Sequence, residues 1–189
     1  MRTLRSIFIV TVGLWLLVGL AYPLAMTGVS QIFFRHQANA SPVTVNGQVV
    51  ASQNIGQYFN KPGYFWGRPS ATVPPDNPMA SGPSNLGPTN PQLLTQIKRQ
   101  IHRLKKADPG LKNSEIPISL VETSGSGLDP DITPKAAMIQ IPRVARATGL
   151  STTVLRQLVQ SHIQPAGVFG VREVNVVLLN IALYQRLHR

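Results

Sequence analysis

The longest apolar run of the sequence lies near its N-terminus. Residues 7–34 contain no charged side chain, and residues 7–26 are the most hydrophobic part of this run. A helix needs about 20 apolar residues to cross the hydrocarbon core of a bilayer. The pattern therefore predicts a transmembrane helix, and Pro23 is expected either to kink this helix or to mark its outer end.

Basic residues near the apolar run predict its orientation. Arg2, Arg5 and the α-amino group precede the run, whereas only Arg35 follows it closely. This excess of positive charge predicts a cytoplasmic N-terminus and an extracytoplasmic location for the rest of the chain. The alternative is a cleaved signal peptide, because Ala38-Asn39-Ala40 has the small-x-small form of a cleavage site. The run is about twice as long as the apolar core of a signal peptide, so a retained anchor is favoured.

After the anchor, the pattern changes to short elements and a long irregular segment. Asn46-Gly47 between two triplets rich in valine predicts a β-hairpin over residues 43–50. Residues 69–91 are rich in proline, glycine and serine and show no apolar period. Irregular segments of this length are usually functional or docked on a partner.

The second half of the sequence predicts mainly helices. Apolar residues at helical spacing follow Pro91, with Thr89 or Asn90 as the N-cap and Pro109-Gly110 as the end. Residues 116–121 are predicted to form a strand. Further helices are expected over residues 134–140 and 142–148, after Ser151, and from Asn175 as a helix or as a strand followed by a helix.

These elements predict an α+β fold with its strands early in the chain. Residues 1–34 are expected to be the N-terminal transmembrane anchor. Residues 35–189 are expected to be a single mixed α/β extracytoplasmic domain.

Composition narrows the chemistry that this domain can perform. Cysteine is absent, which excludes thiol catalysis, disulfides and cysteine metal sites. Seven acidic residues against 18 basic ones give a net charge of +11 and leave few carboxylates for acid–base pairs. No phosphate-binding loop of the form Gly-x4-Gly-Lys-Ser/Thr is present. The histidines at positions 36, 102, 162 and 188 are too far apart for a local metal pair, so no metal or cofactor site is predicted.

Two groups of residues suggest alternative functions. Ser126 with Asp129 would suit a membrane-anchored periplasmic hydrolase, but no histidine lies near them in the sequence. Asp129 and Asp131 are assigned loop and capping roles rather than a metal site. Basic residues would suit a polyanion-binding module or the solvated face of a helix, and the second is favoured because apolar residues occupy the other face. These basic residues are Lys98, Arg99, Arg103, Lys105, Lys106 and Lys112.

Six phrases, in order behind one apolar run, resemble a known family. They are Ile55-Gly56-Gln57 with Phe59, residues 64–71 (YFWGRPSA), 80–91 (ASGPSNLGPTNP), 124–130 (SGSGLDP), 139–146 (IQIPRVAR), and 174–176 with 179–183 (VNV and LNIAL). Together they resemble the C subunit of the Kdp-type potassium-transporting ATPase. The resemblance covers essentially the whole chain.

The resemblance implies a non-catalytic subunit of a high-affinity, ATP-driven potassium uptake pump in the bacterial plasma (inner) membrane. In that family an A subunit carries the potassium path, a P-type B subunit hydrolyses ATP, and a small F subunit completes the complex. ATP and potassium are thus handled by partner subunits. A family proposal makes the C subunit a catalytic chaperone for ATP binding by the B subunit. An extracytoplasmic domain cannot reach cytoplasmic ATP, so stabilising the pump and capping the outer entrance of the potassium path is favoured.

Five residues are singled out as candidate contacts. Tyr64, Phe65, Trp66 and Arg68 have the residue types enriched at binding hot spots, and they are either partner contacts or the core of the domain itself. Gln140 stands among apolar residues and is either a ligand contact or a buried, hydrogen-bonded amide. No residue is assigned a catalytic or metal-binding role.

Overall fold

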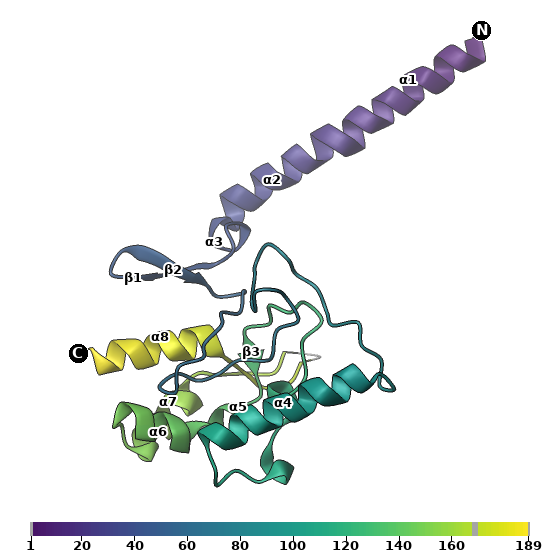
Figure 1. Ribbon diagram of the computed structural model, residues 1–189. Coiled ribbons are helices and arrows are strands. Elements are labelled where there is room, and N and C mark those ends of the chain that lie inside the picture. The colour runs from purple at the N-terminus through teal and green to yellow at the C-terminus, as the bar shows by residue number, and fades with distance from the viewer. Residues whose placement is uncertain (1, 168–169, 189) are drawn as a thin grey trace. The chain divides into compact units, whose positions relative to one another are not determined.

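The computed structural model describes residues 2–167 and 170–188 (Figure 1). The chain divides into two compact units, Met1–Pro42 and Val43–Arg189. The first unit is almost entirely helical. The second unit combines a hairpin, a small sheet, several helices and long irregular segments.

The first unit contains one continuous helix, which is built from α1 (Arg2–Leu16), a π-helical turn η1 (Leu17–Ala21) and α2 (Tyr22–Phe33). The helix has 32 residues, its most apolar 18-residue stretch has a mean hydropathy of 2.2, and none of that stretch is buried, so the helix is long and apolar enough to cross a membrane. Pro23 cannot donate a hydrogen bond, and the chain widens into the π turn just before it, where the Tyr22 N–H bonds to the Leu17 carbonyl. Pro23 therefore does not end the helix. A short helix α3 (Arg35–Ala38) follows.

The second unit opens with the expected hairpin. Strands β1 (Pro42–Val45) and β2 (Gln48–Ser52) pair, and the two residues between them, Asn46 and Gly47, have φ values of 51° and 78°. Positive φ at both positions is the requirement of a type I′ turn, which explains why Asn-Gly stands here.

The helix predicted from Pro91 is confirmed as α4 (Pro91–Ala107). The Asn90 side chain accepts a hydrogen bond from the Gln92 N–H, and Pro91 occupies the first turn, where its missing N–H has no cost. The apolar stripe of α4 is less covered than its pattern indicated. Leu104 is buried, but 55% of Leu94 is exposed.

The strand predicted over residues 116–121 is wrong. Two short 3₁₀ turns, η2 (Asn113–Glu115) and η3 (Ile118–Leu120), occupy this region. Pro117 lies between them and has no N–H to donate to a neighbouring strand. Leu120 is buried because the 3₁₀ turn directs it inward, not because side chains alternate along a strand.

The main sheet lies late in the chain, not early as predicted. It is antiparallel, with the order β3–β5–β4, and its strands have only two or three residues: β3 (Asp131–Ile132), β4 (Ile163–Gln164) and β5 (Glu173–Asn175). Val174 at the centre pairs with Ile132 on one side and Ile163 on the other. The strands are too short for their alternation to be visible in the sequence.

The remaining helices form as the sequence predicted. They are α5 (Pro134–Met138), α6 (Ile141–Thr148), α7 (Thr152–Ser161) and α8 (Val176–Leu187). Thr133, Ser151 and Asn175 cap α5, α7 and α8 through their side-chain oxygens, and Gly149 ends α6 with a φ of 75°.

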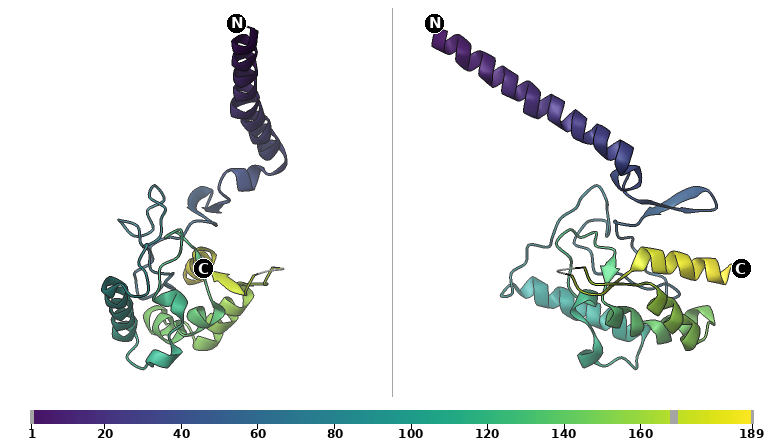
Figure 2. Two further views of the ribbon diagram at one scale, coloured as in Figure 1. Left: turned by 90° about the vertical axis from the view of Figure 1, so that its right-hand side faces the viewer. Right: turned by 180° about the vertical axis from the view of Figure 1, so that it is seen from behind.

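The core of this unit forms where α5, α6, α7 and α8 contact one another and the sheet. Figure 2 shows the irregular segments running between α4 on one side and α8 on the other. One of these segments inserts Phe65 into the core, where it is fully buried with side chains from α7 and α8. Burial of these apolar side chains is the main stabilising contribution to the unit.

Candidate functional site

Two side-chain amides hold the irregular segment Tyr64–Trp66 in place. Asn180 of α8 accepts a hydrogen bond from the Phe65 N–H at 2.8 Å and donates one to the Phe65 carbonyl at 2.9 Å. Gln140 contacts the Trp66 N–H at 2.7 Å and the Trp66 carbonyl at 3.0 Å in the same manner. Buried peptide groups need such partners, so the two amides replace the neighbouring strand that this segment lacks. We call Gln140 and Asn180 the amide clamp.

Arg143 of α6 extends the amide clamp. One of its nitrogens, Nη1, donates to the carbonyls of Pro62 and Tyr64, and Nη2 donates to Gln140 Oε1 at 2.6 Å. Gln140 Nε2 also donates to the Ala136 carbonyl at 3.0 Å. The amide of Gln140 thus makes four hydrogen bonds, which is its full capacity.

The indole ring of Trp66 carries two guanidinium groups. The Cζ atoms of Arg143 and Arg103 lie 3.9 and 4.4 Å from the ring centroid, and the Cζ atom of Arg103 also lies 5.7 Å from the ring centroid of Tyr58. Burial, and secondly the charge of Arg103, lower the pKa of Arg143 to about 10, which leaves it a cation at neutral pH. Attraction to the aromatic ring offsets part of the repulsion between these two charges.

The phrases singled out in the sequence meet at one junction. Arg68 forms an ion pair with Asp129 at 3.0 Å, and Ser70 Oγ donates to the Gly127 carbonyl at 2.7 Å. The Gly82 N–H donates to the Ser126 carbonyl at 2.8 Å. Residues 66–71, 80–83 and 124–130 therefore lie side by side, although up to about 60 residues separate them in the chain.

Two glycines of this junction lie where backbone segments approach closely. At Gly127, where φ is 68°, an added Cβ would lie 2.7 Å from the Gly82 carbonyl oxygen. At Gly56, it would lie 3.1 Å from the carbonyl oxygens of Leu128 and Asp129. At Gly127 the backbones are too close for a side chain, whereas at Gly56 a side chain would require its neighbours to shift by a few tenths of an ångström.

The four aromatic and arginine candidates have different environments. Phe65 is fully buried and only 7% of Trp66 is exposed. Of the two roles considered for them, these two residues therefore have that of core residues of the domain. Tyr64 is half-buried, and Arg68 is half-buried in its ion pair with Asp129. Gln140 is buried and fully hydrogen-bonded, which is the second of the two roles considered for it.

The groups behind the alternative functions are engaged inside the domain. Ser126 Oγ accepts from the Leu128 N–H at 3.1 Å, and Asp129 is paired with Arg68 and accepts from the Asp131 N–H. Of the six basic residues, Arg103 is half-buried and packs on aromatic rings, whereas the others are exposed. Among the described residues, no group of three or more histidines and carboxylates is placed to hold a metal ion.

Two carboxyl groups have raised pKa values. Burial, followed by the charges of Asp129 and Glu173, raises the pKa of Asp131 to about 6, and a hydrogen bond with Asn175 opposes this. Its Oδ1 atom is buried without a hydrogen-bond partner. Burial alone raises the pKa of Asp76 to about 6. Of the two residues assigned loop and capping roles from the sequence, Asp129 accepts from the Asp131 N–H in a turn, whereas Asp131 lies in strand β3 and Thr133 caps the helix that follows.

A hollow of about 340 Å³ lies between the hairpin and α8. Val45, Val50, Phe59, Tyr64 and Tyr184 line it together with uncharged polar groups. It has no charged side chain, so it offers nothing to balance a phosphate or a metal ion.

Asn180 and Arg143 are structural residues that the sequence reasoning did not identify. A signal was present for Asn180, because it is a single amide within the apolar run of residues 176–183. The same signal drew attention to Gln140. No local pattern indicates the backbone partners of Gln140 and Asn180, which lie 74 and 115 residues away in the chain.

Fold and site together define a protein with one long apolar helix followed by a mixed domain. The polar side chains of this domain mainly form hydrogen bonds that hold its irregular segments in place. Comparison with known proteins gives its family. Residues 4–185 match the family described as "KdpC: K+-transporting ATPase, c chain", and the chain belongs to this family.

Curated relatives agree over nearly the full length. A potassium-transporting ATPase KdpC subunit of Janthinobacterium sp. (strain Marseille) is 49% identical over 97% of this chain and 98% of its own. The subunit of the same name from Rhodopseudomonas palustris (strain BisB18) is 45% identical over 97% of this chain and 98% of its own. The one from Variovorax paradoxus (strain S110) is 51% identical over 88% of each chain. The chain is therefore a KdpC-type subunit of a potassium pump.

Proposed function

We propose that this chain is a non-catalytic subunit that is anchored in the bacterial plasma membrane and stabilises a pump made with A, B and F subunits. The observation that carries this proposal is the use of the polar side chains. Gln140, Asn180, Arg143, Ser70 and Asp129 bind backbone or each other instead of lining an open site. Such a framework gives a surface of fixed shape, which suits binding to other subunits.

The proposal places ATP hydrolysis in the B subunit and the potassium path in the A subunit. The domain of this chain lies outside the membrane, where it covers the outer entrance of the potassium path. Direct contact with cytoplasmic ATP is not part of the proposal. Gln140, the residue first considered for such a contact, has no free hydrogen-bonding capacity.

Reconstitution tests the accessory role. The A, B and F subunits are co-expressed with and without the tagged full-length chain, and potassium-stimulated ATPase and subunit recovery are measured in mild detergent. We expect both to fall when the chain is omitted and the chain alone to hydrolyse no ATP. A complex of A, B and F that purifies intact with full potassium-stimulated activity would refute the proposal.

Cysteine labelling tests the topology, and the absence of native cysteine makes the result simple to interpret. Gln160→Cys, on the exposed side of α7, should react with a membrane-impermeant thiol reagent in cells whose outer barrier admits it. Thr3→Cys should react only after the membrane is opened. The reverse pattern would place the domain in the cytoplasm and would reopen the question of contact with ATP.

A further inference from the structure

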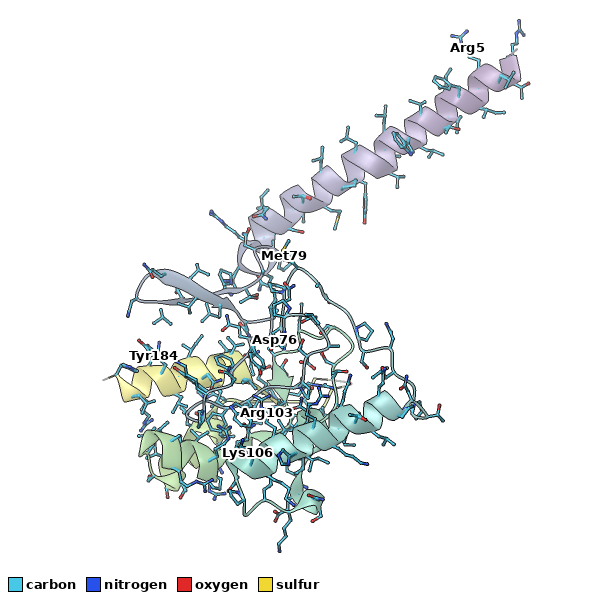
Figure 3. The ribbon with its side chains drawn as sticks, in the orientation of Figure 1. Arg5, Asp76, Met79, Arg103, Lys106 and Tyr184 are labelled. Atoms are coloured by element: carbon cyan, nitrogen blue, oxygen red, sulfur yellow. The ribbon has the colours of Figure 1, made fainter. Side chains whose placement is uncertain are left out.

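The loop formed by residues 72–82 presents two apolar side chains to solvent almost completely. Met79 is 91% exposed and Val73 is 87% exposed, more than any other large apolar residue among those described, including those of the apolar helix. The three prolines of the loop, at positions 74, 75 and 78, are also exposed. Figure 3 shows Met79 at the outer end of the loop, which stands out from the body of the second unit. Single exposed apolar residues are ordinary, whereas exposed apolar surface that gathers in one place marks a binding site, so these two side chains are of interest because they lie on one short loop.

This loop has no regular secondary structure, yet its own polar groups hold it in one shape. Thr72 Oγ1 accepts from the Asn77 N–H at 2.9 Å and donates to the Pro74 carbonyl at 2.9 Å. Asn77 in turn donates from its side chain to the Val73 carbonyl and accepts from the Met79 N–H at 3.0 Å. Thr72 directly precedes Val73 in the chain, and Asn77 lies two residues before Met79, so both apolar residues stand next to a fixed position.

The base of the loop is fixed to the junction described above. Ser70 Oγ accepts from the Asp76 N–H at 2.9 Å and donates to the Gly127 carbonyl, and Gly82 bonds to the Ser126 carbonyl. The loop therefore keeps its shape before any partner is present. Such preorganisation lowers the entropy lost on binding and raises affinity for a complementary surface.

The charge of this region indicates the kind of partner. Residues 69–97 contain a single charged residue, Asp76, and it is half-buried. A surface for anionic lipid or nucleic acid would carry lysine or arginine, and neither occurs in this stretch. Depletion of charge together with exposed methionine is instead typical of the centre of a protein–protein interface.

We propose that the 72–82 loop is a preformed apolar plug that inserts into an apolar pocket on the outer surface of another subunit of the potassium pump. This inference rests on the proposed function, because a subunit of a pump has such surfaces within its reach. Val73 and Met79 are the side chains that enter the pocket. The Thr72–Asn77 hydrogen bonds position them.

The first experiment measures assembly of the pump with the full-length chain. The double variant Val73→Ser, Met79→Ser is compared with the matched double variant Leu94→Ser, Ile118→Ser, which alters two other exposed apolar residues of the same unit. We expect the loop variant to need about tenfold more chain for half-maximal assembly, because two central contacts are lost. The matched variant should assemble as the wild type does.

Folding is checked on the same samples. Neither Val73 nor Met79 is buried, so both double variants should melt at the wild-type temperature. If the loop variant assembles with unchanged affinity, the plug is refuted although the accessory role stands. If the wild-type chain itself fails to assemble with the other subunits, the proposed function fails instead.

The second experiment identifies the occupant of the surface. Met79→Cys is labelled with a photoactivatable maleimide in the assembled pump and irradiated, with Ile118→Cys as the control position. We expect a covalent adduct with another pump subunit from Met79→Cys, identified by mass spectrometry, and little from the control. An adduct of two copies of this chain, an adduct with lipid alone, or equal adducts from both positions would overturn the proposal.

Discussion

Replacing Asn180 tests the amide clamp most directly. Asn180→Leu keeps the branched shape at Cγ but removes both hydrogen bonds to Phe65, whose N–H and carbonyl lie 2.8 and 2.9 Å from the native amide. The site is 1% exposed, so water cannot replace these bonds. The variant leaves two buried peptide groups without partners.

The magnitude follows from those two groups. A buried donor or acceptor left without a partner costs about 1–3 kcal/mol, so the loss of unfolding free energy for two such groups should be about 2–6 kcal/mol. This is a large fraction of the roughly 5–15 kcal/mol that stabilises a domain. With a urea m value of about 2 kcal/mol/M, the unfolding midpoint should fall by roughly 1–3 M.

Tryptophan fluorescence of the full-length chain in detergent measures this change. The chain has two tryptophans, so a Trp15→Phe background leaves Trp66, which is hydrogen-bonded to the amide clamp, as the only tryptophan, and excitation at its long-wavelength edge avoids the tyrosines. Gln185→Leu makes a similar amide-to-leucine change on the exposed side of the same helix and is the control. A midpoint for Asn180→Leu that equals the control would refute the reasoning.

A charge variant at the same position separates hydrogen bonding from packing. Asn180→Asp keeps the acceptor for the Phe65 N–H but loses the donor to the Phe65 carbonyl when it is ionised. The protonated carboxyl regains an O–H donor. Its stability deficit should therefore shrink as the pH falls, whereas that of Asn180→Leu should not.

Three further predictions concern the rest of the chain. Gln140→Leu should destabilise the second unit at least as much as Asn180→Leu, because Trp66 and the cation of Arg143 both lose a partner; equal urea midpoints for Gln140→Leu and the wild type would contradict this. Asp76→Asn should stabilise the chain at pH 7.5 but not near pH 4, because burial raises the pKa of Asp76 from 3.8 to about 6 and the ionised form is the disfavoured one. That change corresponds to roughly 3 kcal/mol, which solvent screening at this half-exposed site reduces to about 1, measurable in melts at the two pH values. Replacing residues 7–26 with leucine should leave the second unit folded but weaken assembly about tenfold, because Gly13, Gly19, Ala21 and Ala25 no longer allow close helix packing; undiminished recovery of the other subunits would make the helix a tether only.

The elements that the sequence predicted correctly are those set by local chemistry. The hairpin follows from Asn46-Gly47, and the helix starts follow from Asn90, Thr133 and Ser151, whose side chains each bond within three residues. Such signals do not depend on the rest of the fold. The long apolar helix is equally local, since it depends only on composition and length.

The elements that the sequence failed to predict depend on distant partners. The three-stranded sheet joins strands of two or three residues, and β3 pairs with β5 across more than 40 residues of chain. The apolar residues of 116–121 suited a strand, but Pro117 and the absence of a pairing strand give 3₁₀ turns instead. The site shows the same limit: Gln140 was identified as unusual, but its function as a clamp requires knowing that Trp66 lies beside it.

A continuous series of hydrogen bonds and one ion pair connects the amide clamp to the 72–82 loop. Along the segment from Phe65 to Thr72, the side chains of Asn180 and Gln140 hold residues 65 and 66, and Asp129 holds Arg68. Ser70 then bonds to Gly127, and Thr72 shapes the loop itself. Nearly every second residue between Phe65 and Thr72 is held by a hydrogen bond or an ion pair. The buried core therefore determines the position of the 72–82 loop, although no helix or strand connects them. Loosening the clamp should therefore weaken assembly as well as folding, and Asn180→Leu should lower pump assembly even under conditions where the domain remains folded.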